Sequence, residues 1–200
     1  MLFRSEATLK SLGMSFADVI SVRSFLSPMD QTGAAVEEIH KLHQGPQVVV
    51  EWLAPGTIEI ELVAASPNPP AEPEQRVEFL TPPGMQASPV YSRVARTYGT
   101  SLIFVSGLYG TSSRSGAEEV NQIFASLEQL LKTAGGNLRN LAKATYFVST
   151  DDASTKLNEL RPKYYDPQRP PAASKAMVRG TGISDKTLTL DMIAVPAPRE

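Results

Sequence analysis

The chain has 200 residues, of which 42% are hydrophobic, and it carries a formal net charge of −2. This composition is ordinary for a globular protein with an apolar core. Lysine and arginine never form a run longer than two residues, so the broad basic surface of nucleic-acid-binding proteins is not expected. The absence of cysteine excludes disulfides, thiolate metal sites and a cysteine nucleophile.

The sequence does not predict a membrane span or a secretory signal. Glu6 falls where a signal peptide needs an apolar core, and no apolar run approaches the length of a transmembrane helix. We therefore expect a soluble, cytoplasmic protein with neither a membrane nor a nucleic-acid partner.

The first 66 residues predict the order helix, strand, helix, strand, strand. The predicted elements are a helix at 2–12, a strand at 19–26, a helix between Asp30 and Gly45, and strands at 48–53 and 58–64. Gly13 should close the first helix. The composition of residues 54–56 favours a tight turn that joins the last two strands.

A proline-rich segment then divides the chain. Residues 67–73 contain four prolines, which favour an extended spacer over a packed element. We therefore expect a partial unit at residues 1–66, a linker at 67–76 and a complete domain at 77–200.

The complete domain predicts an α+β fold with two layers. Its predicted elements are strands at 90–98 and 102–106, a helix at 115–134, a strand at 141–149, a helix from 151, and strands at 173–179 and 188–195. Gly99 and Thr100 suit a hairpin between the first two strands, and the last two should pair around residues 180–185. Pro162 should end the second helix. Helices on one sheet face leave the other to a neighbouring copy.

The N-terminal part also repeats the end of the complete domain. Residues 9–13 match 131–135, residues 25–27 match 147–149, and residues 58–64 match 188–194. The first two pairs share a displacement of 122 positions and the third has 130, which indicates a repeat. Because the first copy lacks an opening hairpin and most of its first helix, it should expose apolar faces. Either the natural protein begins further upstream or a neighbouring segment covers them.

An ordered set of short motifs in residues 77–196 resembles the Rid (YjgF, L-PSP endoribonuclease) family. The motifs are Pro89-Val90-Tyr91-Ser92, Phe104-Val105-Ser106-Gly107, the helix end at 127–135, Asn158, Pro171-Ala172-Ala173-Ser174 and the closing strand at 188–195. The resemblance implies a chorismate-mutase-like fold, trimers whose sheets close a central barrel, and small-molecule clefts between subunits, with no cofactor. Its second half recurs in residues 2–66, so we expect the two copies to pack side by side in a pseudo-symmetric relative of that trimer.

The resemblance also implies an activity, which one residue puts in question. Members of the family hydrolyse enamine and imine intermediates to ketoacids and ammonia, and a guanidinium fork suits the carboxylate of a 2-imino acid. In the family's deaminases an Arg after Pro-Ala supplies it, but Ala173 stands there in this chain and Gln47 in the first copy. Losing such a contact costs about 2 to 5 kcal/mol of binding. Efficient deamination is therefore not expected.

The remaining site residues follow from the same resemblance. The carboxylate that helps to place water corresponds to Asp191, and to Glu61 in the first copy. The other pocket-lining positions are Tyr91, Ser106, Gly107, Asn158 and Ala173. Lys175 lies two residues beyond Ala173 on the same strand face, about 6 to 7 Å along, where it is placed to supply a replacement positive charge.

Each candidate also has a structural explanation. Lys175 can protect a strand edge, Asp191 can make a structural hydrogen bond, and Tyr91 can be an aromatic residue at a subunit contact. Gly107 fits a close approach of the backbone. Histidines 40 and 43 share a helical spacing without a third ligand, so a solvated helix face is expected and no metal site.

Three functions follow from the sequence. The first is a divergent Rid-like protein whose interface cleft binds a small organic molecule without efficient imino-acid deamination. The second is a hydrolase that acts on C=N bonds, with Asp191 steering water and Lys175 as the anchor. The third is an endoribonuclease, which is least favoured because neither a basic surface nor a catalytic histidine is evident.

Overall fold

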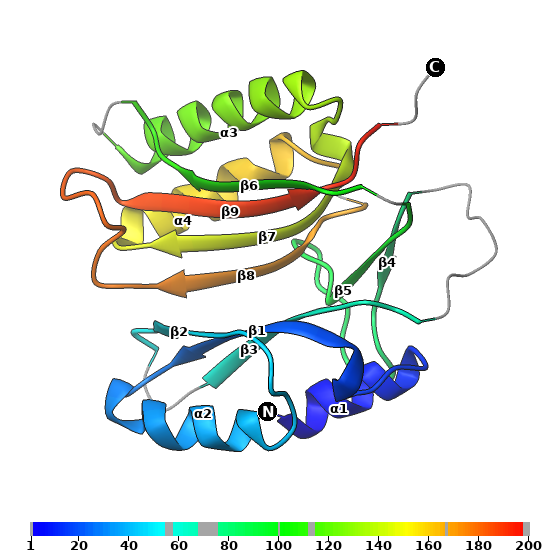
Figure 1. Ribbon diagram of the computed structural model, residues 1–200. Helices are drawn as coiled ribbons and strands as arrows, with labels where there is room; N and C mark the ends of the chain where they lie inside the picture. The colour runs from blue at the N-terminus through cyan, green and yellow to red at the C-terminus, as the bar shows by residue number, and fades with distance from the viewer. Residues whose placement is uncertain are drawn as a thin grey trace. The chain divides into compact units, whose positions relative to one another are not determined.

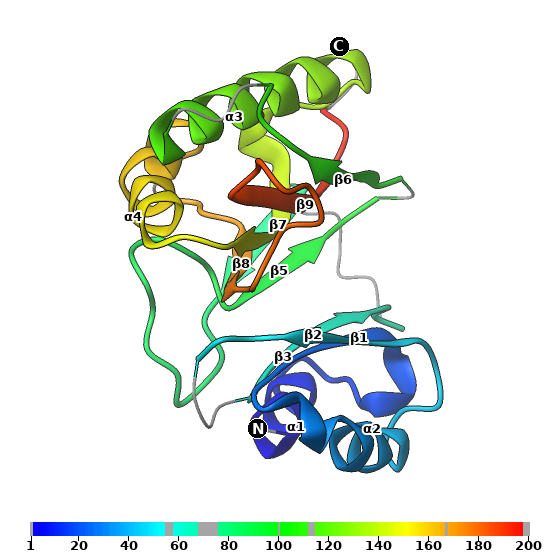
Figure 2. The ribbon, with the colours of Figure 1, turned by 90° about the vertical axis from the view of Figure 1, so that its left-hand side faces the viewer.

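The computed structural model describes residues 2–54, 58–67, 76–99, 101–111, 115–166 and 168–197. The chain divides into two compact units, Met1–Ala71 and Glu72–Glu200. Figures 1 and 2 show both units. Most of the expected linker, and the turn expected at residues 54–56 apart from Ala54, lie outside the described residues.

The N-terminal unit is a three-stranded sheet with two helices on one face (Figure 1). Its strands are β1 (Val19–Leu26), β2 (Gln47–Glu51) and β3 (Ile58–Ala64), and its helices are α1 (Leu2–Ser11) and α2 (Thr32–His40). The central strand β1 pairs with β2 in parallel and with β3 antiparallel. Leu9 of α1 and Ile39 of α2 are buried against Val19 and Val22 of β1. The apolar spacing that predicted both helices therefore forms this core.

The C-terminal unit has a four-stranded sheet with the order β6-β9-β7-β8. The strands are β6 (Ile103–Leu108), β7 (Leu141–Val148), β8 (Ala172–Met177) and β9 (Leu188–Ala194), and the helices are α3 (Gly116–Thr133) and α4 (Asp151–Leu160). Both helices cover the same face (Figure 2). This is the α+β, chorismate-mutase-like arrangement that the sequence predicts.

The helices of this unit begin and end where the sequence predicts. Ser115 Oγ accepts the Glu118 N–H (3.3 Å), and Thr150 Oγ1 accepts the Ala153 N–H (3.2 Å), so each helix has a side-chain cap. The apolar stripe of α3 is fully buried at Val120, Ile123, Phe124, Leu127 and Leu131. Burying such a side chain contributes about 1.5 to 3 kcal/mol. A short 3-10 helix, Arg161–Lys163, follows α4 at Pro162.

Two predicted strand pairings are wrong. The strand β5 (Val94–Thr97) pairs with β4 (Val77–Leu80), while β6 pairs with β9, so the hairpin expected at Gly99 does not form. The last two strands do not pair with each other, because β7 lies between β8 and β9. In the same way β1 lies between β2 and β3. A strand that returns through a helix lies parallel to the strand before it, which leaves the other side of that strand for the antiparallel one.

The two sheets share one order and one register around their central strands. Val22 of β1 lies opposite Gln47 of β2, and Ala144 of β7 lies opposite Ala173 of β8. Each central strand also has a register shift near its beginning, where it pairs with the antiparallel strand. Gln47 and Ala173, which the sequence comparison aligned, therefore occupy the same position in the two sheets.

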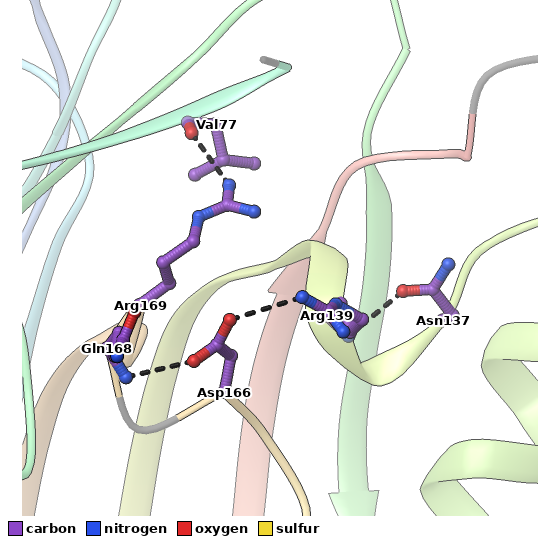
Figure 3. A network of polar contacts seen from close by, with 6 residues as sticks. All are labelled: Val77, Asn137, Arg139, Asp166, Gln168 and Arg169. Carbon is purple, nitrogen blue, oxygen red and sulfur yellow. Dashed lines mark hydrogen bonds and ion pairs between the residues drawn. The ribbon is translucent and has the colours of Figure 1, made fainter.

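The β4–β5 ribbon is tied to the sheet of the C-terminal unit. Val77 is buried against Ala142 of β7, and its carbonyl oxygen accepts a hydrogen bond from Arg169 Nη2 at 3.1 Å. Figure 3 shows this contact beside the ion pair between Arg139 and Asp166 (3.2 Å). The loop after α4 therefore holds the ribbon in place.

Candidate functional site

Lys175 is directed from β8 toward α4. Its Nζ donates hydrogen bonds to Ser154 Oγ at 2.8 Å and to Asn158 Oδ1 at 3.2 Å. Ser154 and Asn158 are four residues apart and therefore lie one above the other on the same face of α4. The fold thus brings together two residues from the sequence prediction, Lys175 and Asn158. Lys175 is half-buried and Asn158 is exposed, so the amine lies near the surface.

Arg161 brings a second positive charge to the same place. Only 5% of this residue is exposed, and its Nε has no hydrogen-bond partner among the described residues. The guanidinium carbon lies 5.4 Å from the ring centroid of Tyr146, which is fully buried. Within the described part of the chain, neither Arg161 nor Lys175 forms an ion pair with a carboxylate. Buried charges are normally compensated, so the site suits an anion.

The surroundings shift the pKa values of this cluster. Burial lowers the pKa of Lys175 below its ordinary value, and the charge of Arg161 lowers it further. Burial raises the pKa of Tyr146 and of Tyr165, while Arg161 opposes both shifts. Both tyrosines are therefore neutral at physiological pH, and a larger fraction of Lys175 is neutral than for an exposed lysine.

Asp191 lies on the other face of the sheet. It is paired with Thr145 of β7, while its neighbours Leu190 and Met192 are buried under the helices. This agrees with the alternation along the strand. Lys175 faces the helices, so the two candidate catalytic residues do not converge within the C-terminal unit.

Ala173 shares the helix-facing side of β8 with Lys175 and packs at the border of the core. Its methyl group carries no charge at the position where the family's deaminases have a guanidinium.

Glu61, which corresponds to Asp191 in the N-terminal unit, forms an ion pair with Arg23 at 3.5 Å. Its side chain is 8% exposed, so this carboxylate has a structural partner within its own sheet.

The remaining candidates lie at opposite edges of the sheet: Tyr91 is next to Ser92, which pairs with Ala172 of β8, while Ser106 and Gly107 belong to β6. Tyr91 precedes β5, and the Arg93 guanidinium lies 4.8 Å from its ring centroid. Ser106 and Gly107 form an irregularity in the pairing of β6 with β9. Gly107 has a φ of 68°, and a Cβ there would meet nothing within 4 Å. The glycine thus serves a left-handed backbone rather than the expected close approach.

The sequence prediction missed Arg161, Ser154 and Tyr146. Ser154, Asn158 and Arg161 follow the spacing i, i+4, i+7, a polar stripe that places all three on one side of the helical segment. That spacing is the sequence signal that could have identified these residues. Their contact with Lys175 depends on where β8 lies beside α4, which no local sequence pattern predicts.

Two cavities are lined by residues of the N-terminal unit. One, of about 590 Å³, lies beside α1 and α2 and includes Phe3, which is 80% exposed. The other, of about 350 Å³, is lined in part by His43. The predicted solvated face is wrong for His43, which is 5% exposed, because it packs under Gly45 after α2 has ended.

Within the described ranges, no group of three or more His, Asp or Glu side chains could hold a metal ion. The helices in those ranges are also too short or too polar to cross a lipid bilayer.

The family model described as endoribonuclease L-PSP matches residues 84–195. The chain belongs to this family, the Rid (YjgF, L-PSP endoribonuclease) family, as its motifs predict.

Solved structures of the family resemble this fold. A YjgF-family protein from Neisseria meningitidis is 18% identical with a TM-score of 0.47, and the match covers 62% of this chain and 97% of that chain. A Rid-family protein from Yersinia pestis is 11% identical with a TM-score of 0.49, and the match covers 60% of this chain and 98% of that chain. Mmf1 from yeast is 22% identical with a TM-score of 0.45, and the match covers 60% of this chain and 99% of that chain. A comparison with curated proteins gave no match.

Proposed function

We propose that the chain is a divergent Rid-like protein that binds a small anionic organic molecule beside Lys175, in a cleft between subunits. The observation that carries this proposal is the pair of cations Lys175 and Arg161, which have no carboxylate partner in the described part of the chain. A carboxylate ligand compensates both charges, and charge-assisted hydrogen bonds are stronger than neutral ones.

Slow hydrolysis of 2-imino acids follows from Ala173. The Arg that holds the substrate carboxylate in the family's deaminases is replaced by a methyl group at this position. A single point charge from Lys175 lacks the two parallel donors of a guanidinium. We expect a turnover efficiency about 10² to 10³ lower than with the bidentate contact.

A coupled assay of 2-iminopropionate hydrolysis tests this function. The wild-type protein should hydrolyse the compound poorly, and Ala173→Arg should raise the rate because it restores a guanidinium on the helix-facing side of β8. Ala172→Arg is the matched control, since its side chain points to the opposite face of the strand and should leave the rate unchanged. Efficient turnover by the wild-type protein would contradict the proposal.

A second candidate function is C=N hydrolysis with Asp191 as the residue that steers water. The retained carboxylate favours it. Because Lys175 lies on the other sheet face, this mechanism needs Asp191 from a second copy of the chain. Mixing the Asp191→Asn protein with the Lys175→Met protein should therefore restore activity that each variant lacks alone. If a defined RNA were cleaved instead, and Asp191→Asn abolished the cleavage, the endoribonuclease function would replace both.

We also infer that the N-terminal unit is a partial second copy of the fold, and that copies of the chain associate into a trimer or a related pseudo-symmetric assembly. The shared order and register of β2-β1-β3 and β8-β7-β9 support the first inference. Family membership supports the second. A cleft between subunits depends on this association.

A further inference from the structure

The amine of Lys175 has surroundings unlike those of four other lysines in the described chain. Lysines 10, 41, 156 and 186 each lie within ion-pair distance of a carboxylate. Lys175 instead has two neutral partners, Ser154 Oγ and Asn158 Oδ1, and the nearby charged group that affects it is Arg161. A carboxylate would favour the ammonium form, whereas burial and the charge of Arg161 make a larger fraction of Lys175 neutral than in an exposed lysine.

We propose that Lys175 is a nucleophile that condenses with the carbonyl group of a small 2-oxo acid to form a Schiff base. The proposal concerns the ligand site described above and rests on the proposed function. It adds the class of ligand, a carbonyl compound with an adjacent carboxylate, and a covalent step.

The two hydrogen bonds of Lys175 leave room for the lone pair of its neutral form. A neutral amine has two N–H groups and one lone pair, while an ammonium has three N–H groups. Ser154 and Asn158 provide two acceptors, and the third position of Nζ is without a partner in the described residues. In the neutral form of Lys175, the lone pair takes this third position, where an electrophile would approach.

The charge distribution explains how the amine becomes reactive. A lysine that is desolvated or placed beside another cation is activated as a nucleophile. Both conditions hold here, since burial and then Arg161 lower the pKa of Lys175. The positive charge of Arg161 also attracts the carboxylate of a 2-oxo acid.

The proposed step balances without an oxidant or reductant. The lone pair of Nζ attacks the carbonyl carbon, the C=O π pair moves to oxygen, and a proton transfer gives a carbinolamine. The C–O bond then breaks, and the oxygen leaves as water with both amine protons, so that a C=N bond forms. Attack by water reverses the sequence and returns the free 2-oxo acid.

Reductive trapping tests the proposal on the full-length protein. The protein is incubated with pyruvate and sodium cyanoborohydride, and the adduct is located by intact mass and peptide mapping. We expect one dominant adduct, on Lys175, and its loss in Lys175→Arg. The matched control Lys163→Arg removes an exposed lysine near Arg161 and should leave the adduct in place.

Arg161→Met tests the role of the second cation. Without the positive charge the pKa of Lys175 rises, so the half-maximal yield of adduct should move to higher pH. The advantage of pyruvate over propionaldehyde, which lacks a carboxylate, should also shrink. A merely structural role of Arg161 would lower the yield at every pH and for both compounds alike. Circular dichroism confirms that each variant is folded.

The outcomes separate this inference from the proposed function. Adducts spread over exposed lysines, or no adduct despite pyruvate binding detected by calorimetry, would overturn the nucleophile and leave the anion site standing. If pyruvate neither binds nor is trapped, both proposals fail.

Discussion

Two tyrosines beside Arg161 differ in their hydrogen bonds. Tyr146 is fully buried, and its hydroxyl has no partner in the described residues, whereas the Tyr165 hydroxyl donates to the Val90 carbonyl oxygen at 3.3 Å. A buried hydroxyl without a partner costs about 1 to 3 kcal/mol, and a typical hydrogen bond contributes about 1 kcal/mol. The two hydroxyl groups therefore have opposite effects on stability.

We expect Tyr146→Phe to raise the free energy of unfolding by about 1 kcal/mol, and Tyr165→Phe to lower it by about 1 kcal/mol. Urea denaturation followed by circular dichroism measures both changes. Each variant loses only one oxygen atom, so the pair controls for packing. A destabilised Tyr146→Phe protein would mean that the hydroxyl makes a hydrogen bond in solution, with Arg161 or Tyr165 as the nearest candidates.

At the residue scale, sequence reasoning works where a rule is local and does not where the partner is distant. Alternation along a strand places Lys175 with Ala173 and Asp191 away from Leu190, and the sheet register agrees. The contact of Lys175 with Ser154 and the burial of Arg161 depend on how α4 lies across β8. No spacing within either segment contains that information.

At the scale of elements, the start of α3 is packed so closely on α4 that it requires a glycine. Gly116 N–H donates to Asp152 Oδ2 at 2.7 Å, and a Cβ at this position would lie 2.7 Å from the Ala153 Cα. Gly33 in α2 differs, because a Cβ there would meet nothing within 4 Å. The two helices thus offer a matched pair of glycines.

We predict that Gly116→Ala lowers the free energy of unfolding by about 1 to 3 kcal/mol, because α3 must move away from α4. Gly33→Ala should raise it by about 0.5 to 1 kcal/mol, since alanine has the higher helix propensity. Thermal unfolding followed by calorimetry measures both shifts. If Gly116→Ala is as stable as the wild type, the two helices are further apart in solution than the structure shows.

Helices were easier to predict than strand partners for a physical reason. Ser115 and Thr150 act as caps on their own helices, and an apolar stripe repeats within the helix itself. Strand pairing instead joins distant segments. The Gly99-Thr100 pair suits a hairpin, yet β5 pairs with β4 and β6 with β9.

At the scale of the whole molecule, the N-terminal unit exposes surface that its counterpart buries. The cavity of about 590 Å³ is lined by Leu2 and Ala35. At the displacement of 122 positions these correspond to Phe124 of α3 and Leu157 of α4, whose side chains are fully buried in the core. Exposed apolar surface of this kind favours association.

A second apolar surface belongs to the C-terminal unit. Phe104 on β6 is 70% exposed and lies opposite Ile193 of β9, on the sheet face away from the helices. In the family's trimers this face closes the central barrel, so we expect the wild-type protein to be an oligomer and Phe104→Glu to be a monomer of 21.6 kDa. A buried, unpaired carboxylate is costly, which is why one substitution should suffice.

Light scattering coupled to size-exclusion chromatography measures the mass of each variant. Phe3→Glu is the control, because it places the same charge on the exposed phenylalanine of α1 and should leave the oligomer intact. If Phe3→Glu dissociates the protein and Phe104→Glu does not, the cavity beside α1 is the contact between copies and the barrel arrangement is wrong. A monomeric wild type would exclude the interface cleft, and with it any ligand site that two subunits must complete.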